Sequence, residues 1–385
     1  MRGRYTKDEM KRIDAYAARF GIEVVPCIQT LAHLNQIFRW GEYGAINDTD
    51  DILLIDDERT YTLIDNMFRT LSECYASRKI HIGMDEAHMI GRGKYEDRHG
   101  APKNRADIML RHLNRVVEIA GKYGYQPMMW SDMFFRLAYG GQYYVKEKGA
   151  IDESVRALVP KNLRLVYWDY YNTDSSVYEA MIDSHLDFDR EVMFAGGAWM
   201  WSGFTPSNRF AMKVTDIALD ACKKKGVDKI MLTMWGDDGA ECSDQALLPT
   251  LVFAAEKMYG GNTEAAFKAL TDIDLEKFMK IEAANDIIPT ETPDHLNPSK
   301  YLLYNDCVGG MFDYTVREGD GKTYAEQAKE LKAIERKAGR YSYIFATQRA
   351  LCSVLSAKVE LGVKARAAYK NGDRKAIKAL VKEGY

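Results

Sequence analysis

Short apolar runs that alternate with helical stretches are the feature of this sequence that most constrains its fold. This alternation is typical of βα units, in which helices connect parallel strands and cover the sheet. Several helical stretches stop at a glycine, such as Gly124, Gly226 and Gly260, because glycine adopts the left-handed conformation at a helix end at little cost. The runs that we predict to be strands are residues 22–29, 79–84, 126–130, 163–168, 191–195 and 229–235.

The spacing of these runs and a change of pattern after residue 260 divide the chain into two predicted domains. Successive runs begin 28 to 57 residues apart, which suits a (β/α) barrel of the TIM type, although a complete barrel has eight strands. We therefore expect an incomplete barrel catalytic domain over residues 1–260 and an α-helical region over residues 261–385. In the helical region, an apolar residue recurs at every fourth position and predicts a buried face. These residues are Leu351, Leu355, Val359 and Val363.

Charge and composition exclude several classes of protein. The 53 basic and 56 acidic side chains give a net charge of −3, so no basic surface is expected for nucleic acid or for a membrane. No apolar run approaches the roughly 20 residues that span a bilayer, and the first residues do not resemble a signal peptide. The six cysteines are scattered, so we expect reduced thiols in a cytoplasmic protein. We also expect no cofactor.

Tryptophan is concentrated just after the predicted strands, where the active site of an α/β barrel lies. Indole rings could simply fill the rim of the barrel. They also suit a sugar ring, which has flat apolar faces and polar edges. We therefore predict a carbohydrate pocket. Five of the six tryptophans would form it: Trp130, Trp168, Trp199, Trp201 and Trp235.

Carboxylates stand beside these tryptophans, and Asp85 and Glu86 follow the run at 79–84. Cleavage of a glycosidic bond needs a carboxylic acid that protonates the leaving oxygen. Neighbouring side chains of a strand face opposite ways, so the chain must leave strand geometry if both acids share one site. Either acid could instead begin a helix. His33 could hydrogen-bond an acid and tune its pKa, or could be an ordinary histidine at the rim.

Two other motifs overlap this pair of acids. Asp85-Glu86-Ala87-His88 spells a helicase box, but the phosphate loop that must precede such a box does not occur, so a nucleotide motor is excluded. His81, Asp85, Glu86 and His88 could be read as metal ligands. A strand would send them to opposite faces, so no metal is expected.

The segment His81-Ile82-Gly83-Met84-Asp85-Glu86 resembles the His-x-Gly-x-Asp-Glu motif of the β-N-acetylhexosaminidases of glycoside hydrolase family 20. The chain looks most like the bacterial exo-β-N-acetylglucosaminidase branch that has a C-terminal helical region. Further parts of the likeness follow in order along the chain. They are Arg2-Gly3-Arg4-Tyr5-Thr6, residues 24–31, Trp130-Ser131-Asp132 and Trp235-Gly236-Asp237.

The resemblance implies removal of terminal N-acetylglucosamine or N-acetylgalactosamine from an oligosaccharide or glycoconjugate. The family retains configuration because the substrate's own 2-acetamido oxygen attacks the anomeric carbon. By this likeness Glu86 is the general acid and base, Asp85 orients the acetamido group and stabilises the positive charge, and His33 lies near the acid. Either Tyr170 or Tyr171 should hydrogen-bond the acetamido oxygen. The residues expected to bind the substrate are Trp130, Asp132, Trp168, Asp169, Tyr170, Tyr171, Trp199, Trp201, Trp235 and Asp237.

The chain departs from the family at its beginning. The run at 22–29 looks like the family's third strand, and the two strands before it would bring a sugar-binding arginine and an aspartate that pairs with His33. The open edges of a six-stranded remnant predict self-association through 22–29 or 229–235, or loose folding. Two alternatives remain: a weak or inactive sugar-binding fragment, and a hydrolase whose own nucleophile is Asp169 or Asp237.

Overall fold

The computed structural model describes residues 3–149, 151–188, 190–287 and 297–384. Arg2, where the likeness begins, lies outside these residues. The chain forms two compact units, each described by itself. The first unit comprises Met1–Asp169, Asp174–Ala195 and Ala221–Met231. The second unit comprises Tyr170–Thr173, Gly196–Asp220 and Leu232–Tyr385.

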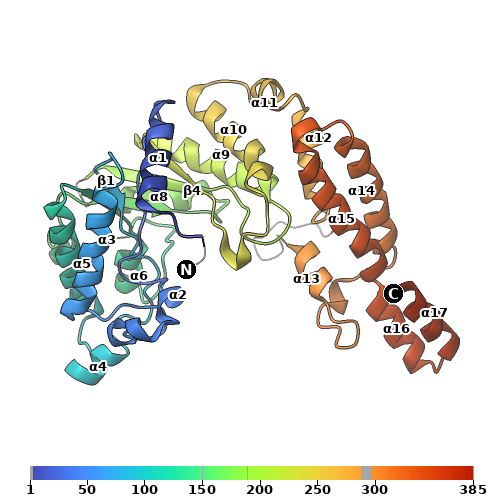
Figure 1. The fold of residues 1–385 in the computed structure, drawn as a ribbon, viewed down its shortest axis with the longest axis horizontal. Coiled ribbons are helices and arrows are strands. Elements are labelled where there is room, and N and C mark those ends of the chain that lie inside the picture. The colour runs from blue at the N-terminus through green and yellow to red at the C-terminus, as the bar shows by residue number, and fades with distance from the viewer. Residues whose placement is uncertain (1–2, 150, 189, 288–296, 385) are drawn as a thin grey trace. The chain divides into compact units, whose positions relative to one another are not determined.

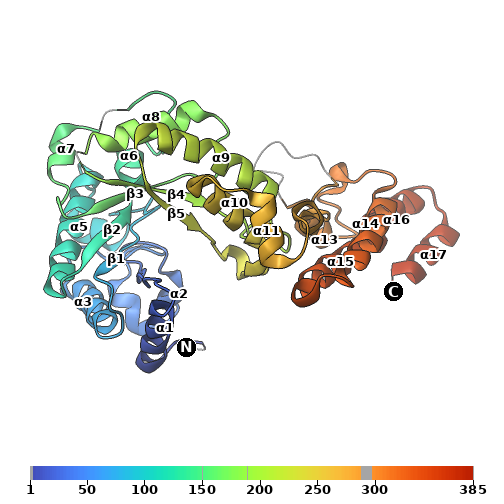
Figure 2. The ribbon, with the colours of Figure 1, turned by 90° about the horizontal axis from the view of Figure 1, so that it is seen from above.

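A parallel sheet is built from strands that lie side by side in chain order (Figure 2). In the register between neighbours, His81 lies opposite Met128 and Trp168 lies opposite Ala195. Most strand residues are buried, which explains why the sequence shows them as continuous apolar runs. The strands are β1 Lys79–His81, β2 Gln126–Trp130, β3 Arg164–Trp168, β4 Val192–Gly197 and β5 Lys229–Thr233.

Helices lie between the strands along the chain, as the alternation predicts (Figure 1). Asp57, Asn104 and Asp174 each accept a hydrogen bond from a backbone N–H at the start of a helix, which fixes where α3, α5 and α8 begin. The helices up to residue 225 are α1 Lys7–Ala18, α2 Asn35–Phe38, α3 Glu58–Ser72, α4 Lys94–His99, α5 Arg105–Lys122, α6 Asp132–Ala138, α7 Glu153–Ala157, α8 Ser175–Leu186 and α9 Asn208–Lys225.

The predicted strand at residues 22–29 is wrong. This segment meets β1 through one parallel bridge, between Cys27 and His81, and the sheet has five strands. Pro26 accepts a hydrogen bond from the His81 N–H but has no N–H of its own to continue a ladder. Ile22 is 59% exposed and adds nothing to the core. The apolar run therefore forms only a short contact beside β1.

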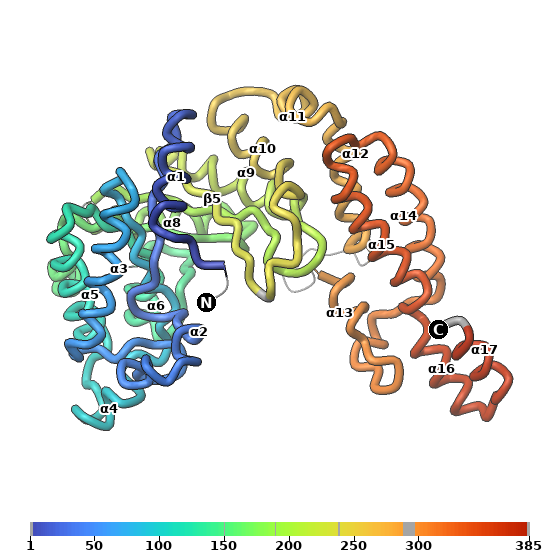
Figure 3. Tube along the Cα trace, viewed as in Figure 1, coloured from blue at the N-terminus to red at the C-terminus, as the bar shows by residue number. Residues whose placement is uncertain are grey.

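The remaining helices belong to the second unit. In the tube of Figure 3, α14 and α15 run side by side. None of the described helices is both long and apolar enough to cross a membrane. These helices are α10 Leu248–Tyr259, α11 Thr263–Thr271, α12 Leu275–Phe278, α13 Pro298–Tyr304, α14 Asp320–Glu335, α15 Ser342–Lys358, α16 Leu361–Lys370 and α17 Arg374–Gly384.

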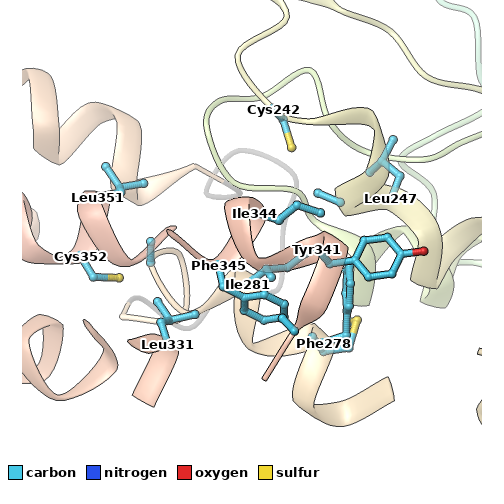
Figure 4. Packing of buried hydrophobic residues seen from close by; sticks show 14 of the residues in the cluster. Cys242, Leu247, Phe278, Ile281, Leu331, Tyr341, Ile344, Phe345, Leu351 and Cys352 are labelled. Carbon is cyan, nitrogen blue, oxygen red and sulfur yellow. The ribbon is translucent and has the colours of Figure 1, made fainter. Parts of the chain in front are cut away.

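The core of the second unit gathers around aromatic rings (Figure 4). Phe278 packs edge-on against Phe345 and Tyr341, with ring centroids 5.5 and 5.8 Å apart. Cys242 and Leu247 belong to the same cluster although they precede residue 260. The two compact units therefore do not divide at residue 260, because the segment after β5 packs with the C-terminal helices.

The predicted apolar face of the C-terminal region is correct for three of its four residues. Leu351, Leu355 and Val359 are buried in the core of the second unit. Val363 is 37% exposed, so the prediction is wrong there. The chain leaves α15 at Lys358 and starts α16 at Leu361, and this break changes the helical phase that the four-residue spacing assumed.

Candidate active site

The chain turns sharply after β1, at the segment that carries Asp85 and Glu86. β1 ends at His81, and Gly83, Met84 and Glu86 have φ angles of 70°, 75° and 51°. These left-handed conformations replace strand geometry, so both carboxylates reach the same imidazole. Glycine suits position 83, because its φ is left-handed and an added Cβ would lie 3.1 Å from the Ile28 carbonyl oxygen and would force the Gln29 side chain to move.

His33 stands among three carboxylates. Its Nε2 lies 3.2 Å from Oδ2 of Asp85 and 3.7 Å from Oε2 of Glu86. On the other side its Nδ1 lies 3.5 Å from Oδ2 of Asp51, which also accepts a hydrogen bond of 2.7 Å from the His33 backbone N–H. The hydrogen bond to Asp85 raises the pKa of His33 to about 9, although burial acts in the opposite direction. The imidazole is therefore a cation at neutral pH and offsets the charge of the acids.

Asp51 is a partner of His33 that the sequence motifs do not include. It contacts His33 from a loop. An antiparallel bridge between Asn47 and Leu53 closes that loop. Sequence offers only a weak signal for it, a cluster of acidic residues shortly after His33.

Asp132 and Arg136 hold Glu86 from two sides. Asp132 is fully buried, and its Oδ2 accepts hydrogen bonds from the Glu86 backbone N–H at 3.1 Å and from Nε of Arg136 at 3.0 Å. A terminal nitrogen of Arg136 lies 3.3 Å from Oε1 of Glu86. The structure thus places Asp132, a residue expected to bind the sugar, beneath the proposed acid. Arg136 was not expected, although its i,i+4 spacing from Asp132 is a signal for the ion pair.

The pKa of Asp132 makes stability depend on pH. Burial raises the pKa to about 7, and the charge of Asp85 adds to this, whereas the Glu86 N–H and Arg136 oppose it. An unfolded aspartate has a pKa of about 3.9, so ionisation of Asp132 destabilises the folded state as pH rises from about 4 through 7. Relative to Asp132→Asn, the wild type should lose up to about 4 kcal/mol of unfolding free energy over this range.

Denaturant unfolding of both proteins from pH 4 to pH 8 measures this difference. Asp228→Asn is the control, because the Asp228 side chain is 77% exposed. A difference between wild type and Asp132→Asn that stays constant with pH would contradict the expected titration.

Aromatic side chains surround Arg136 in the first unit. Its guanidinium lies over the rings of Tyr143 and Trp168, 5.5 and 6.0 Å from their centroids. Trp130 is buried against His81, with ring centroids 4.3 Å apart. Burial lowers the pKa of His81 to about 4, and its Nδ1 accepts the Gly83 N–H. The imidazole is therefore neutral and acts in packing around the turn.

Asp169 also lies in the first unit, on the side of the sheet that faces helix α8. Its buried carboxylate accepts a hydrogen bond of 2.8 Å from the hydroxyl of Tyr167, whose ring packs against His185. Residues two apart on an extended chain share a face, so Asp169 lies on the same face as Tyr167. Trp168, which stands between them, points to the opposite face.

The other expected residues form a group in the second unit. The indole N–H of Trp235 donates to the Tyr170 hydroxyl at 3.1 Å, and that of Trp199 donates to the Tyr170 carbonyl at 3.0 Å. The rings of Trp199 and Trp201 lie 4.5 Å apart. Tyr171 is partly exposed, and Asp237 is exposed in a short 3₁₀ helix after β5. The expected residues thus gather in two groups, one in each unit.

No cluster of three or more metal-ligating side chains is found in the part of the chain that the structure describes. The acids that could have been read as ligands with His81 and His88 instead surround His33 and Arg136. The group in the first unit therefore has the composition of an acid–base site: a largely enclosed carboxylate (Asp85), a partly exposed one (Glu86), a cationic imidazole and a supporting arginine.

Comparison with known proteins identifies the family. The catalytic domain of glycosyl hydrolase family 20 matches residues 1–181, and the glycoside hydrolase 20C C-terminal domain matches residues 276–384. Hexosaminidase D of Bos taurus is 24% identical over 207 residues, which cover 51% of this chain and 54% of that protein. Hexosaminidase D of Homo sapiens is 22% identical over 174 residues, which cover 43% of this chain and 33% of that protein.

Two solved β-N-acetylhexosaminidase structures are also similar to this chain. A β-N-acetylhexosaminidase from Bacteroides fragilis has a TM-score of 0.48 at 16% identity and covers 66% of this chain and 52% of its own. The family 20 β-N-acetylhexosaminidase from Streptomyces coelicolor has a TM-score of 0.36 at 19% identity. The match covers 52% of this chain and 36% of that protein. The chain spans about half, or less, of the length of the curated relatives it matches. Since both the catalytic and the C-terminal match come from one family and together cover most of the sequence, the chain belongs to glycosyl hydrolase family 20.

Proposed function

We propose that this protein is an exo-acting β-N-acetylhexosaminidase built on part of a (β/α) barrel. It would remove terminal β-linked N-acetylglucosamine or N-acetylgalactosamine with retention of configuration. The observation that carries the proposal is the left-handed turn at Gly83–Glu86, which brings Asp85 and Glu86 to one imidazole, His33. This turn lies inside the range that matches the family's catalytic domain.

In the first step the substrate's acetamido oxygen bonds to the anomeric carbon while the glycosidic bond breaks. Glu86, whose side chain is 39% exposed, gives its proton to the leaving oxygen. Asp85 is more enclosed and is held by Nε2 of Gln29 at 3.3 Å and by His33. Its carboxylate accepts the acetamido N–H and stabilises the positive charge of the oxazolinium ring.

In the second step the Glu86 carboxylate takes a proton from water as the water oxygen bonds to the anomeric carbon. The ring opens, the acetamido group is restored, and the sugar leaves with its original configuration. The cationic His33 keeps two neighbouring carboxylates compatible while the proton is absent from Glu86. Trp130 and Trp168, both in the first unit, are proposed to contact the sugar.

A mechanism with a nucleophile supplied by the enzyme is less well supported. It would need a second acid opposite Glu86, and Asp169 was one of the two candidates. Asp169 is buried and bonded to Tyr167, an arrangement that suits a structural carboxylate. The substrate-assisted mechanism needs no such acid.

Two chromogenic substrates test the proposed function. We expect release of nitrophenol from 4-nitrophenyl N-acetyl-β-glucosaminide and no comparable release from 4-nitrophenyl β-glucoside, because the second lacks the acetamido nucleophile. Equal rates, or a carboxylate labelled covalently by a fluoro-sugar, would contradict the mechanism. Binding of N-acetylglucosamine without any release would favour the alternative of a sugar-binding fragment.

A further inference from the structure

A cavity of about 510 Å³ lies in the first unit, between the loops that follow β1 and β2. Its size falls within the range of small-molecule sites, about 300 to 1,000 Å³. The cavity adjoins the proposed acid through two of its lining residues. Arg136 contacts Oε1 of Glu86 at 3.3 Å, and the His88 backbone N–H donates to the Glu86 carbonyl at 2.6 Å.

The charges along this cavity are positive. Its described lining holds the basic side chains of Lys103, Arg105 and Arg136, and no carboxylate. The charge of Arg136 is matched by Glu86 and Asp132. The other two cations carry charge that no described acid matches by an ion pair.

Arg105 and Lys103 differ in what holds them. Arg105 donates to the carbonyl oxygens of Ile90 and His88, which leave its charge unneutralised. Burial and the nearby Arg92 lower its pKa, as expected where positive charge accumulates. Lys103 is exposed and forms no hydrogen bond or ion pair with any residue that the structure describes. The first acid of α5, Asp107, is exposed and accepts a hydrogen bond from the side chain of Asn104.

We propose that this cavity is the subsite for the leaving group and that it selects an aglycone sugar with an anionic substituent, either a uronate carboxylate or a sulfate ester. The inference rests on the proposed function. Because Glu86 protonates the leaving oxygen, the group attached to that oxygen must lie near Glu86, and the neighbouring cavity is lined by Arg136, which contacts Glu86. An anion in the cavity would meet Lys103 and Arg105, and charge-assisted hydrogen bonds to it would favour such substrates over neutral ones.

A matched pair of disaccharides tests this inference. N-acetylglucosaminyl-β-1,4-glucuronic acid and N-acetylglucosaminyl-β-1,4-glucose differ only at C6 of the leaving sugar, and the 6-sulfate of the second provides the sulfate arm. We expect kcat/KM to be about fivefold higher for at least one anionic substrate than for the neutral one. The preferred substrate identifies the anion. The preference should shrink when salt is raised from about 0.05 to about 0.5 M, because the screening length falls from roughly 14 to roughly 4 Å.

Charge reversal at one residue distinguishes the cavity from the general charge of the protein. Lys103→Glu should reduce the ratio of anionic to neutral kcat/KM to about one or below. Lys161→Glu makes the same change of charge at an exposed residue that precedes the start of β3, whereas the cavity follows the ends of β1 and β2. This variant should leave the ratio unchanged. A wild-type ratio of one or less, or the same ratio in Lys103→Glu as in wild type, would overturn the inference alone. Failure to cleave the neutral and the anionic disaccharides as well as the nitrophenyl substrate would overturn the proposed function, and this inference with it.

Discussion

Replacement of Glu86 by Gln is expected to lower kcat/KM about 10²- to 10⁴-fold for an N-acetylglucosaminide whose leaving group is a sugar. The amide keeps the size of the side chain but has no proton to give to the leaving oxygen. A nitrophenol leaves readily without protonation, so 4-nitrophenyl N-acetyl-β-glucosaminide should lose much less activity. Steady-state kinetics with the two substrates measure the difference.

The control for this substitution is Glu118→Gln, on the exposed surface of α5, where Glu118 pairs with Arg115. Its kinetics should equal those of the wild type. Equal losses on both substrates in Glu86→Gln would show that Glu86 acts in binding or folding and not as the proton donor.

Asp85→Asn is expected to lower turnover about 10²- to 10³-fold on both substrates, including the nitrophenyl substrate that Glu86→Gln spares. The amide has the same volume but no charge to stabilise an oxazolinium ring. A thiazoline that mimics this ring should bind the wild type tightly and Asp85→Asn more weakly by a similar factor. Inhibition constants for the two proteins measure this loss. Unchanged inhibition would contradict the role of Asp85 in stabilising charge.

The same variant reports on His33. In the wild type the pKa of His33 is raised to about 9, chiefly by Asp85. The stability that this contributes is present below the unfolded value of about 6.5 and is lost as pH rises through 9. Asp85→Asn should flatten this part of the stability profile. A profile as steep as that of the wild type would show that another group titrates there.

Much of the fold follows from patterns that are local in sequence. Strands buried on both faces must be apolar throughout, so 126–130, 163–168 and 191–195 were recognisable to within two residues. Prediction failed at 22–29, where the composition suited a strand but Pro26 could not continue the hydrogen bonds. It also failed at Val363, where a helix break changed which face was buried.

The adjacent acids Asp85 and Glu86, with His33, were identifiable from residue type and motif alone. Their arrangement was decided by tertiary structure. The left-handed turn at Glu86 is held by a hydrogen bond to Asp132, 46 residues further along the chain. Arg136 and Asp51 join the site through contacts of the same kind, between partners 50 and 18 positions apart in sequence.

Sequence by itself thus determined most of the strands and helices and which chemical groups follow the strands, because burial and backbone preference act over a few residues. Only the tertiary structure decided that Asp132 supports Glu86 from within the core, that Asp51 contacts His33, and that Lys103 and Arg105 line a cavity near the acid. The physical reason is that hydrogen bonds and ion pairs depend on distances of 3 to 4 Å. Such distances between residues far apart in sequence are set by how the loops close, which no local pattern records.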